Sequence, residues 1–105
     1  MKIIVSDKAD NDLMQIFSYL SQQSPQATQS ILDAINRCFV NLKSLPLRGA
    51  PRPDLGRDVR SAIVSPYVIL YAARPDHVTI LRVLHAAAIS KRNFVDDTLP
   101  RRRDP

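Results

Sequence analysis

Apolar residues recur along the chain with two different spacings, and each spacing predicts a different kind of element. A short β-type run occupies residues 1–5. Over residues 6–22, apolar side chains stand three and four positions apart, the spacing of one face of an α-helix; they are Ala9, Leu13, Ile16, Phe17 and Leu20. A second stripe over 25–44 has the same period and comprises Ala27, Ile31, Ala34, Ile35, Cys38, Phe39 and Leu42. Two amphipathic helices joined by so few residues predict an antiparallel hairpin.

Both helices carry signals at their starts. Ser6 is a candidate N-cap, and Asp7 and Asp10 place negative charge in the first turn, where the helix dipole favours anions. Ser24 is the second candidate cap, and Pro25 fits the first helical position because its missing N–H costs nothing there. The sequence therefore predicts where each helix begins.

The helical pattern stops at residues 45–58, which contain three prolines and both glycines of the chain, and this composition predicts a loop. Short turns at Pro66 and 74–77 separate three β-type runs that follow; the runs span 59–65, 67–73 and 78–85. Connections this short predict an antiparallel meander, with the fully apolar middle run at its centre. The order β-α-α-β-β-β predicts an α+β domain in which the helical hairpin packs on a small antiparallel sheet.

A length of 105 residues favours one domain, which we expect over residues 1–96. A short helix over 89–97 and a flexible basic tail over 97–105, with three consecutive arginines at 101–103, are expected at the end.

Cys38 is the only cysteine, so no internal disulfide is possible, and its place on an apolar stripe predicts a buried, inert thiol. No signal peptide or membrane span is visible, which favours a cytoplasmic protein.

Charge is distributed unevenly along the chain, whose net charge is +5. Residues 1–45 hold four lysines or arginines and four aspartates, whereas residues 46–105 hold eleven basic residues and six aspartates. The whole excess of positive charge therefore lies in residues 46–105. Such asymmetry fits an anionic partner, such as nucleic acid, a nucleic-acid enzyme or an acidic peptide, and it fits solubility alone equally well.

Sequence motifs for phosphate, dinucleotide and zinc binding are absent. His77 and His85, the only histidines, lie eight residues apart on one predicted strand, about 26 Å at roughly 3.3 Å per residue. They cannot share a metal ion, so we expect neither a metal nor another cofactor. The candidates that remain for function are basic and aromatic: Arg60, Tyr67, Tyr71, Arg82 and His85.

Each candidate also has a structural interpretation. His85, at the end of a strand, can bond to neighbouring backbone, and Tyr67 and Tyr71 are typical core aromatics. Alternation places Arg82 on the strand face of Val78, Ile80 and Leu84. Because an unpaired buried arginine is very costly, Arg82 must pair with an acid or extend to an edge of the sheet.

Five stretches, taken in order, carry a family resemblance. "ADNDLMQIFSYL" and "SPQATQSILDAI" match the two helices of the family, and "LKSLPLRGAP" matches the end of the second. "VRSAIVSPYVILYAA" carries an Arg, a Tyr and an apolar run closed by Tyr, which are Arg60, Tyr67 and Tyr71. "VTILRVLHAA" matches the last strand, with Arg82 and His85. Over roughly residues 3–96 the chain resembles the ParE/RelE superfamily of type II toxins, and within it the ParE-like, plasmid stabilization group.

The resemblance implies a toxin–antitoxin hetero-oligomer with a ParD-like antitoxin, whose C-terminal segment wraps the toxin. In this superfamily, ParE-like members act on DNA gyrase and RelE-like members cut mRNA on the ribosome. The outer grooves of the helical hairpin offer a site for an amphipathic antitoxin helix. An open edge of the sheet offers one for an antitoxin strand.

Cleavage of mRNA requires positioned acid–base groups, which RelE-like members supply with central basic residues and a tyrosine near the C-terminus. Here no lysine lies between Lys43 and Lys91, and no tyrosine follows Tyr71. A guanidinium transfers protons poorly because its pKa lies above about 12. We therefore favour gyrase inhibition over an mRNA interferase that uses Arg60 and Arg82, and name no catalytic residue. The candidates for toxicity or target binding are Arg60, Tyr71, Arg82, His85, Lys91 and Arg92.

Ala88 departs from the family pattern, because ParE-like sequences commonly carry an arginine three residues after the last-strand histidine. This departure keeps a third function open, that of a toxin-derived binding protein without toxicity. Lys91 and Arg92 follow closely and are candidates to replace the missing arginine.

Overall fold

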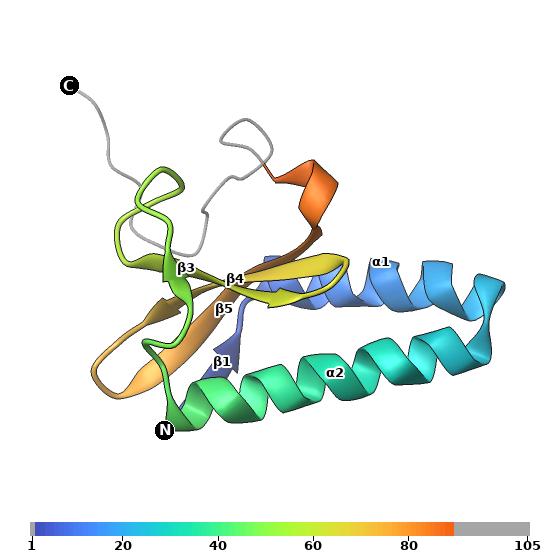
Figure 1. Cartoon of the computed structure of the whole chain (residues 1–105), viewed down its shortest axis with the longest axis horizontal. Helices are drawn as coiled ribbons and strands as arrows, with labels where there is room; N and C mark the ends of the chain where they lie inside the picture. The colour runs from blue at the N-terminus through green and yellow to red at the C-terminus, as the bar shows by residue number, and fades with distance from the viewer. Residues whose placement is uncertain (1, 90–105) are drawn as a thin grey trace.

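Both predicted helices form and begin at their predicted caps. In the computed structural model, which describes residues 2–89, α1 spans Asp7–Gln23 and α2 spans Pro25–Ser44. The Ser6 Oγ accepts the Ala9 N–H at 3.0 Å, and the Ser24 Oγ accepts the Ala27 N–H at 3.2 Å. Ser24 alone separates the two helices, so they fold back on each other as the expected hairpin (Figure 1).

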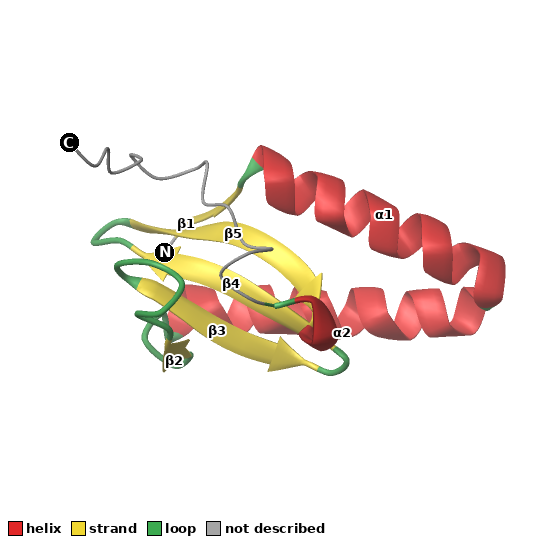
Figure 2. Ribbon diagram, turned by 90° about the horizontal axis from the view of Figure 1, so that it is seen from above, coloured by secondary structure: helices red, strands yellow, loops and turns green. Residues whose placement is uncertain are grey.

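The hairpin packs against a five-stranded sheet of order β1-β5-β4-β3-β2 (Figure 2). Its strands are β1 (Lys2–Val5), β2 (Ala50–Pro51), β3 (Val59–Val64), β4 (Tyr67–Ala73) and β5 (His77–His85). Strands β3, β4 and β5 form the predicted antiparallel meander. Strand β1 runs parallel to β5, which brings the first described residues beside the last strand.

Strand β4 is buried on both faces, which explains its continuous apolar sequence. On the helix side, Ile69 and Tyr71 belong to a large cluster with Ala9, Ile35, Leu42 and Ile80. On the other side, Val68, Leu70 and Ala72 pack with Leu55, Val59 and Leu81. Both helices lie on the same side of the sheet (Figure 1). The expected α+β layering is therefore present, with a second small cluster on the face away from the helices.

Strand β5 contains a β-bulge that the sequence pattern did not predict. Leu70 pairs with Arg82 and Tyr71 pairs with Ile80, so Leu81 is the extra residue. The bulge inverts the alternation of side chains beyond it. The expectation that Leu84 shares a face with Val78 and Ile80 is therefore wrong, because Leu84 packs against the opposite cluster and Val83 joins the helix-side core instead.

The segment 45–58 is a loop apart from the two residues of β2, which pair with Arg60 and Ser61. A proline is tolerated in β2 because this strand lies at the sheet edge.

After β5, Ala86–Ala88 form one turn of 3₁₀ helix (η1). The expected short helix over 89–97 and the basic tail over 97–105 lie outside the described residues, apart from Ile89, which is extended. Among residues 2–89, no helix is long and apolar enough to cross a membrane.

Candidate functional site

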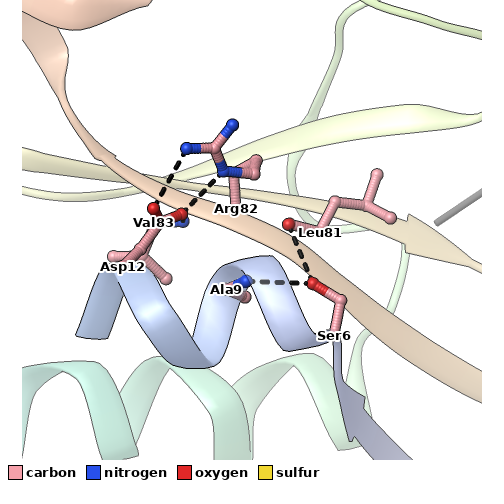
Figure 3. A network of polar contacts seen from close by, with 6 residues as sticks. All are labelled: Ser6, Ala9, Asp12, Leu81, Arg82 and Val83. Atoms are coloured by element: carbon pink, nitrogen blue, oxygen red, sulfur yellow. Dashed lines mark hydrogen bonds and ion pairs between the residues drawn. The ribbon is translucent and has the colours of Figure 1, made fainter. Parts of the chain in front are cut away.

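Arg82 of β5 forms a bidentate ion pair with Asp12 of α1 (Figure 3). Its Nε donates to Asp12 Oδ2 at 2.8 Å and a terminal guanidinium nitrogen donates to Oδ1 at 3.0 Å. The Val83 N–H donates to the same Oδ2 at 3.0 Å. Only 16% of the Arg82 side chain and 10% of the Asp12 side chain are exposed. Of the two outcomes expected for Arg82, pairing with an acid is therefore the one observed.

The start of α1 also binds the backbone of β5 at the bulge. The Ser6 N–H donates to the Ile80 carbonyl at 3.0 Å, and the Ser6 hydroxyl donates to the Leu81 carbonyl at 3.0 Å while it caps the helix. Figure 3 shows this contact at the N-terminal end of α1, with Asp12 farther along the same helix. Ser6 and Asp12 together bond to backbone groups of the irregular segment, so α1 fixes the conformation from which Arg82 projects.

Arg60 and Tyr71, cross-strand neighbours on β3 and β4, hold the loop before β2. The Tyr71 hydroxyl donates to the Pro46 carbonyl at 2.9 Å and accepts the Gly49 N–H at 2.8 Å. Arg60 donates to the Gly49 and Leu47 carbonyls at 2.7 and 3.2 Å. Tyr71 is fully buried, so it cannot present its ring to a target and any part it has in toxicity is through this loop.

Gly49 is required at this contact for steric reasons. A Cβ added there would lie 2.5 Å from the Tyr71 hydroxyl and 2.7 Å from the Ser61 carbonyl oxygen. Burial raises the pKa of Tyr71, and the hydrogen bond from the Gly49 N–H and the charge of Arg60 offset part of this rise. The hydroxyl is therefore kept in its neutral form, which is the form that can donate to Pro46.

His85 is exposed at the end of β5. Its Nδ1 accepts the Ala87 N–H at 3.1 Å and so caps η1. In the neutral ring, this bond assigns the proton to Nε2, which makes Nε2 a hydrogen-bond donor. The ring also stands edge-on to Tyr67, with centroids 5.8 Å apart and an interplanar angle of 81°. His85 thus has both the structural role considered from the sequence and a ring edge that faces solvent.

Four of the predicted site residues fall into two groups, and Arg82 lies apart from both in its pair with Asp12. Arg60 and Tyr71 pair at one point of the meander, and Tyr67 and His85 pair near the other end of β4. Tyr67 and Tyr71 are four residues apart on this strand, about 13 Å at roughly 3.3 Å per residue. Lys91 and Arg92 lie outside the described residues. The predicted residues therefore do not converge on a single catalytic centre within residues 2–89.

A groove that the sequence did not indicate lies between α2 and β3. It has a volume of about 580 Å³ and is lined by Arg37, Cys38 and Asn41 of α2, Arg48 of the loop and residues 61–65. Arg37 and Arg48 are exposed. Cys38 lines this groove, where burial raises its pKa and nearby Arg48 lowers it in part. The periodicity of α2 gives no signal for the groove, because Arg37 looks like any residue of a solvated helix face.

Comparisons with known proteins identify the family of the chain and support its fold. The chain is similar to a solved structure described as the chromosomal ParDE TA system from P. aeruginosa, with a TM-score of 0.67 and 23% identity; the match covers 81% of this chain and 95% of the other. This likeness supports the fold. No curated protein matches the chain. The family model of the ParE toxin of the type II toxin–antitoxin system parDE matches residues 3–89. The chain therefore belongs to the ParE toxin family of type II toxin–antitoxin systems.

Proposed function

We propose that this toxin inhibits DNA gyrase and that a cognate ParD-like antitoxin neutralises it in a hetero-oligomer. Membership of the ParE family supports the toxin–antitoxin part of the proposal. The excess of positive charge after residue 45 supports an anionic partner, which an acidic antitoxin or an enzyme that works on DNA provides.

One observation favours gyrase over mRNA as the target: the side chains that are candidates for RNA cleavage are engaged in structural contacts. Arg82 uses its Nε and a terminal nitrogen on Asp12, and Arg60 donates to two loop carbonyls. A general base needs a free lone pair on its reacting nitrogen, whereas neutral His85 presents Nε2–H to solvent. Among residues 2–89, these three residues are therefore better suited to support structure and contact a partner than to transfer protons.

A supercoiling assay with purified toxin and DNA gyrase tests the proposal. We expect the native protein to inhibit supercoiling and to leave ribosome-bound mRNA intact. Cleavage of that mRNA with supercoiling unaffected would instead identify an mRNA interferase. Absence of both activities, together with normal growth of cells that express the toxin alone, would identify a binding protein that has lost toxicity, the function that Ala88 keeps open.

His85 provides the matched variants for this assay. His85→Asn keeps a side-chain acceptor for the Ala87 N–H but removes the imidazole, whereas His85→Ala removes both. If the exposed ring contacts the target, both variants inhibit supercoiling several-fold less than the native toxin, at nearly unchanged thermal stability for His85→Asn. Full inhibition by His85→Asn would show that His85 serves only as a cap.

A further inference from the structure

A smaller pocket lies where β3 begins and β4 ends, and none of its lining residues also lines the groove between α2 and β3. Its volume is about 260 Å³. Pockets for drug-sized ligands have about 300–1,000 Å³, so this one has room for a single side chain or a small ion. The walls are mostly apolar and carry two charged side chains; the residues that matter here are Leu47, Pro51, Pro53, Ala73, Asp58 and Arg60.

Arg60 is fixed in this pocket with one edge of its guanidinium unused. Its Nη1 donates to the Gly49 and Leu47 carbonyls at 2.7 and 3.2 Å. Within residues 2–89, its Nε and Nη2 have no hydrogen-bond partner. Arg82 and Arg52 each use this same pair of nitrogens to bind an aspartate through two hydrogen bonds. The corresponding edge of Arg60 therefore has the geometry for a carboxylate from outside the described chain.

The surroundings of Arg60 favour a carboxylate. The two loop carbonyls already fix the guanidinium, so little side-chain entropy is lost when a partner binds. The apolar walls keep water from competing, which strengthens a charge-assisted hydrogen bond. Arg60 is the only cation among the lining residues, all of which lie within the described chain. One arginine balances the single charge of an aspartate or glutamate, whereas a phosphate dianion would keep an uncompensated charge.

Asp58 opposes the binding of any anion here. It lines the same pocket and forms an exposed ion pair with Arg74 at 3.3 Å. A second carboxylate in the pocket is therefore repelled by Asp58 and attracted by Arg60. Asp58 has a φ of 63°, a conformation that asparagine also adopts readily. Asp58→Asn thus removes the repulsion and leaves the turn unchanged.

We propose that this pocket binds one acidic side chain of DNA gyrase, whose carboxylate accepts hydrogen bonds from Nε and Nη2 of Arg60. The inference rests on the proposed function and gives it a specific contact. Arg60 then has two roles, because Nη1 holds the loop and the opposite edge holds the target. The excess of positive charge after residue 45 agrees with an acidic surface on the target.

Leu47 offers a test that leaves Arg60 intact. Its side chain is 66% exposed and lines the pocket. Leu47→Glu brings a carboxylate of the toxin itself to the arginine, where it competes with the carboxylate of gyrase. Surface plasmon resonance with immobilised gyrase and full-length toxin should show about tenfold weaker binding for Leu47→Glu than for Leu47→Gln, which has the same length without the charge. Equal affinities of these two variants would overturn the inference.

Leu45 provides the matched control for the added charge. It belongs to the same loop and is 57% exposed, but it does not line the pocket. We expect Leu45→Glu to bind gyrase with nearly the affinity of the native toxin. A loss as large as that of Leu47→Glu would show that any added negative charge weakens binding, and the pocket would then have no specific role.

Two further variants change affinity in opposite directions. Asp58→Asn should bind gyrase about threefold more tightly, because it removes a like charge from the pocket. Such a gain cannot result from unfolding, and unchanged or weaker binding would contradict the proposal. Arg60→Lys keeps the positive charge but lacks the planar pair of donors, so it should bind about tenfold more weakly. Circular dichroism of Arg60→Lys establishes that it is folded, and native affinity of the folded variant would also contradict the proposal.

The same variants identify the source of the anion. They should change the affinity for gyrase without DNA. An effect seen only with gyrase bound to DNA would assign a DNA phosphate to Arg60, and an effect seen only on binding of the antitoxin would assign the carboxylate to the antitoxin. Either result would overturn the inference.

Failure of the site and failure of the function give different results. If the native toxin inhibits gyrase and every pocket variant binds as the native toxin does, the inference fails and the proposed function stands. If the native toxin neither binds nor inhibits gyrase, the proposed function fails and the inference fails with it.

Discussion

Asp12 and Arg82, 70 residues apart in the sequence, form a two-point ion pair that joins α1 to the bulge of β5. The pair is largely buried, and the same carboxylate also accepts the Val83 N–H. A carboxylate in this position serves two elements at once, because it neutralises the guanidinium and satisfies a backbone donor of β5. The pair therefore stabilises the junction between the helical layer and the sheet.

Removal of either partner leaves the other charge buried without its counterion. We expect Asp12→Ala to lower the free energy of unfolding by about 3 kcal/mol, and Arg82→Ala to have a similar effect. The double variant should lose less than the sum of the two, because no isolated charge remains. Urea unfolding measures all three values. Asp54→Ala, which breaks the exposed pair with Arg52, should cost less than about 1 kcal/mol.

The two N-cap serines form a matched pair with different surroundings. Both accept the N–H three residues later, but only the Ser6 hydroxyl also donates across the core, to the Leu81 carbonyl. We expect Ser24→Ala to cost about 1 kcal/mol and Ser6→Ala about 2 kcal/mol, because the second change also leaves a buried carbonyl without a donor. Equal losses in thermal or urea unfolding would show that the bond to Leu81 contributes nothing.

Gly49→Ala should destabilise the toxin by about 1–3 kcal/mol, because the new methyl group overlaps the Tyr71 hydroxyl and the Ser61 carbonyl. Combination with Tyr71→Phe removes the nearest overlapping atom. The loss in the double variant should therefore be smaller than the sum of the single losses. A fully additive result in urea unfolding would show that the overlaps which remain, with the Ser61 carbonyl and with the ring of residue 71, account for the effect.

The Tyr71 hydroxyl predicts a dependence of stability on alkaline pH. An unfolded tyrosine ionises near pH 10, whereas burial raises the pKa of folded Tyr71 above that value. Between these two pKa values the unfolded chain binds fewer protons, so stability falls as pH rises. The contribution is complete below about pH 10 and is lost as pH passes through the raised folded pKa.

The free energy of unfolding of Tyr71→Phe should therefore fall less steeply with pH above pH 10. At pH 7 this variant should be about 1–2 kcal/mol less stable than the native protein, because the Gly49 N–H and the Pro46 carbonyl lose their partner. Urea unfolding at a series of pH values measures both effects. Tyr67 and Cys38, whose pKa values burial also raises, contribute to the remaining slope. Identical slopes in the native protein and the variant would contradict the assignment to Tyr71.

Local signals predicted the helices and the meander because their causes are local. Ser6 and Ser24 cap the helices through contacts three residues away, and the apolar run of β4 reflects burial on both faces. The bulge at Leu81 was not predictable, since the Leu81 carbonyl and the nearby Val83 N–H bond to Ser6 and Asp12 from the other end of the chain. A regular alternation of side chains, without a bulge, therefore placed Leu84 on the helix-side face of the sheet, which is wrong.

The same limit applies to the candidate site. The sequence singled out Arg60, Tyr71, Arg82 and His85 by residue type, and each of them has a definite polar contact in the structure. Their partners are loop carbonyls, a helix carboxylate and a backbone N–H, and the first two depend on tertiary packing. The groove beside β3 was missed because its two arginines are brought together only when the loop leaves the sheet edge at Gly49.

The parallel pairing of β1 with β5 bears on how a cell makes this protein. During synthesis, α1 leaves the ribosome long before the strand that supplies the counterion of Asp12. Strand β1 and the helical hairpin cannot pack into the sheet before β5 is made, because β5 lies between β1 and β4. Contacts between such distant parts of a chain form slowly. The nascent toxin therefore completes its fold only after nearly all of the described chain has been translated.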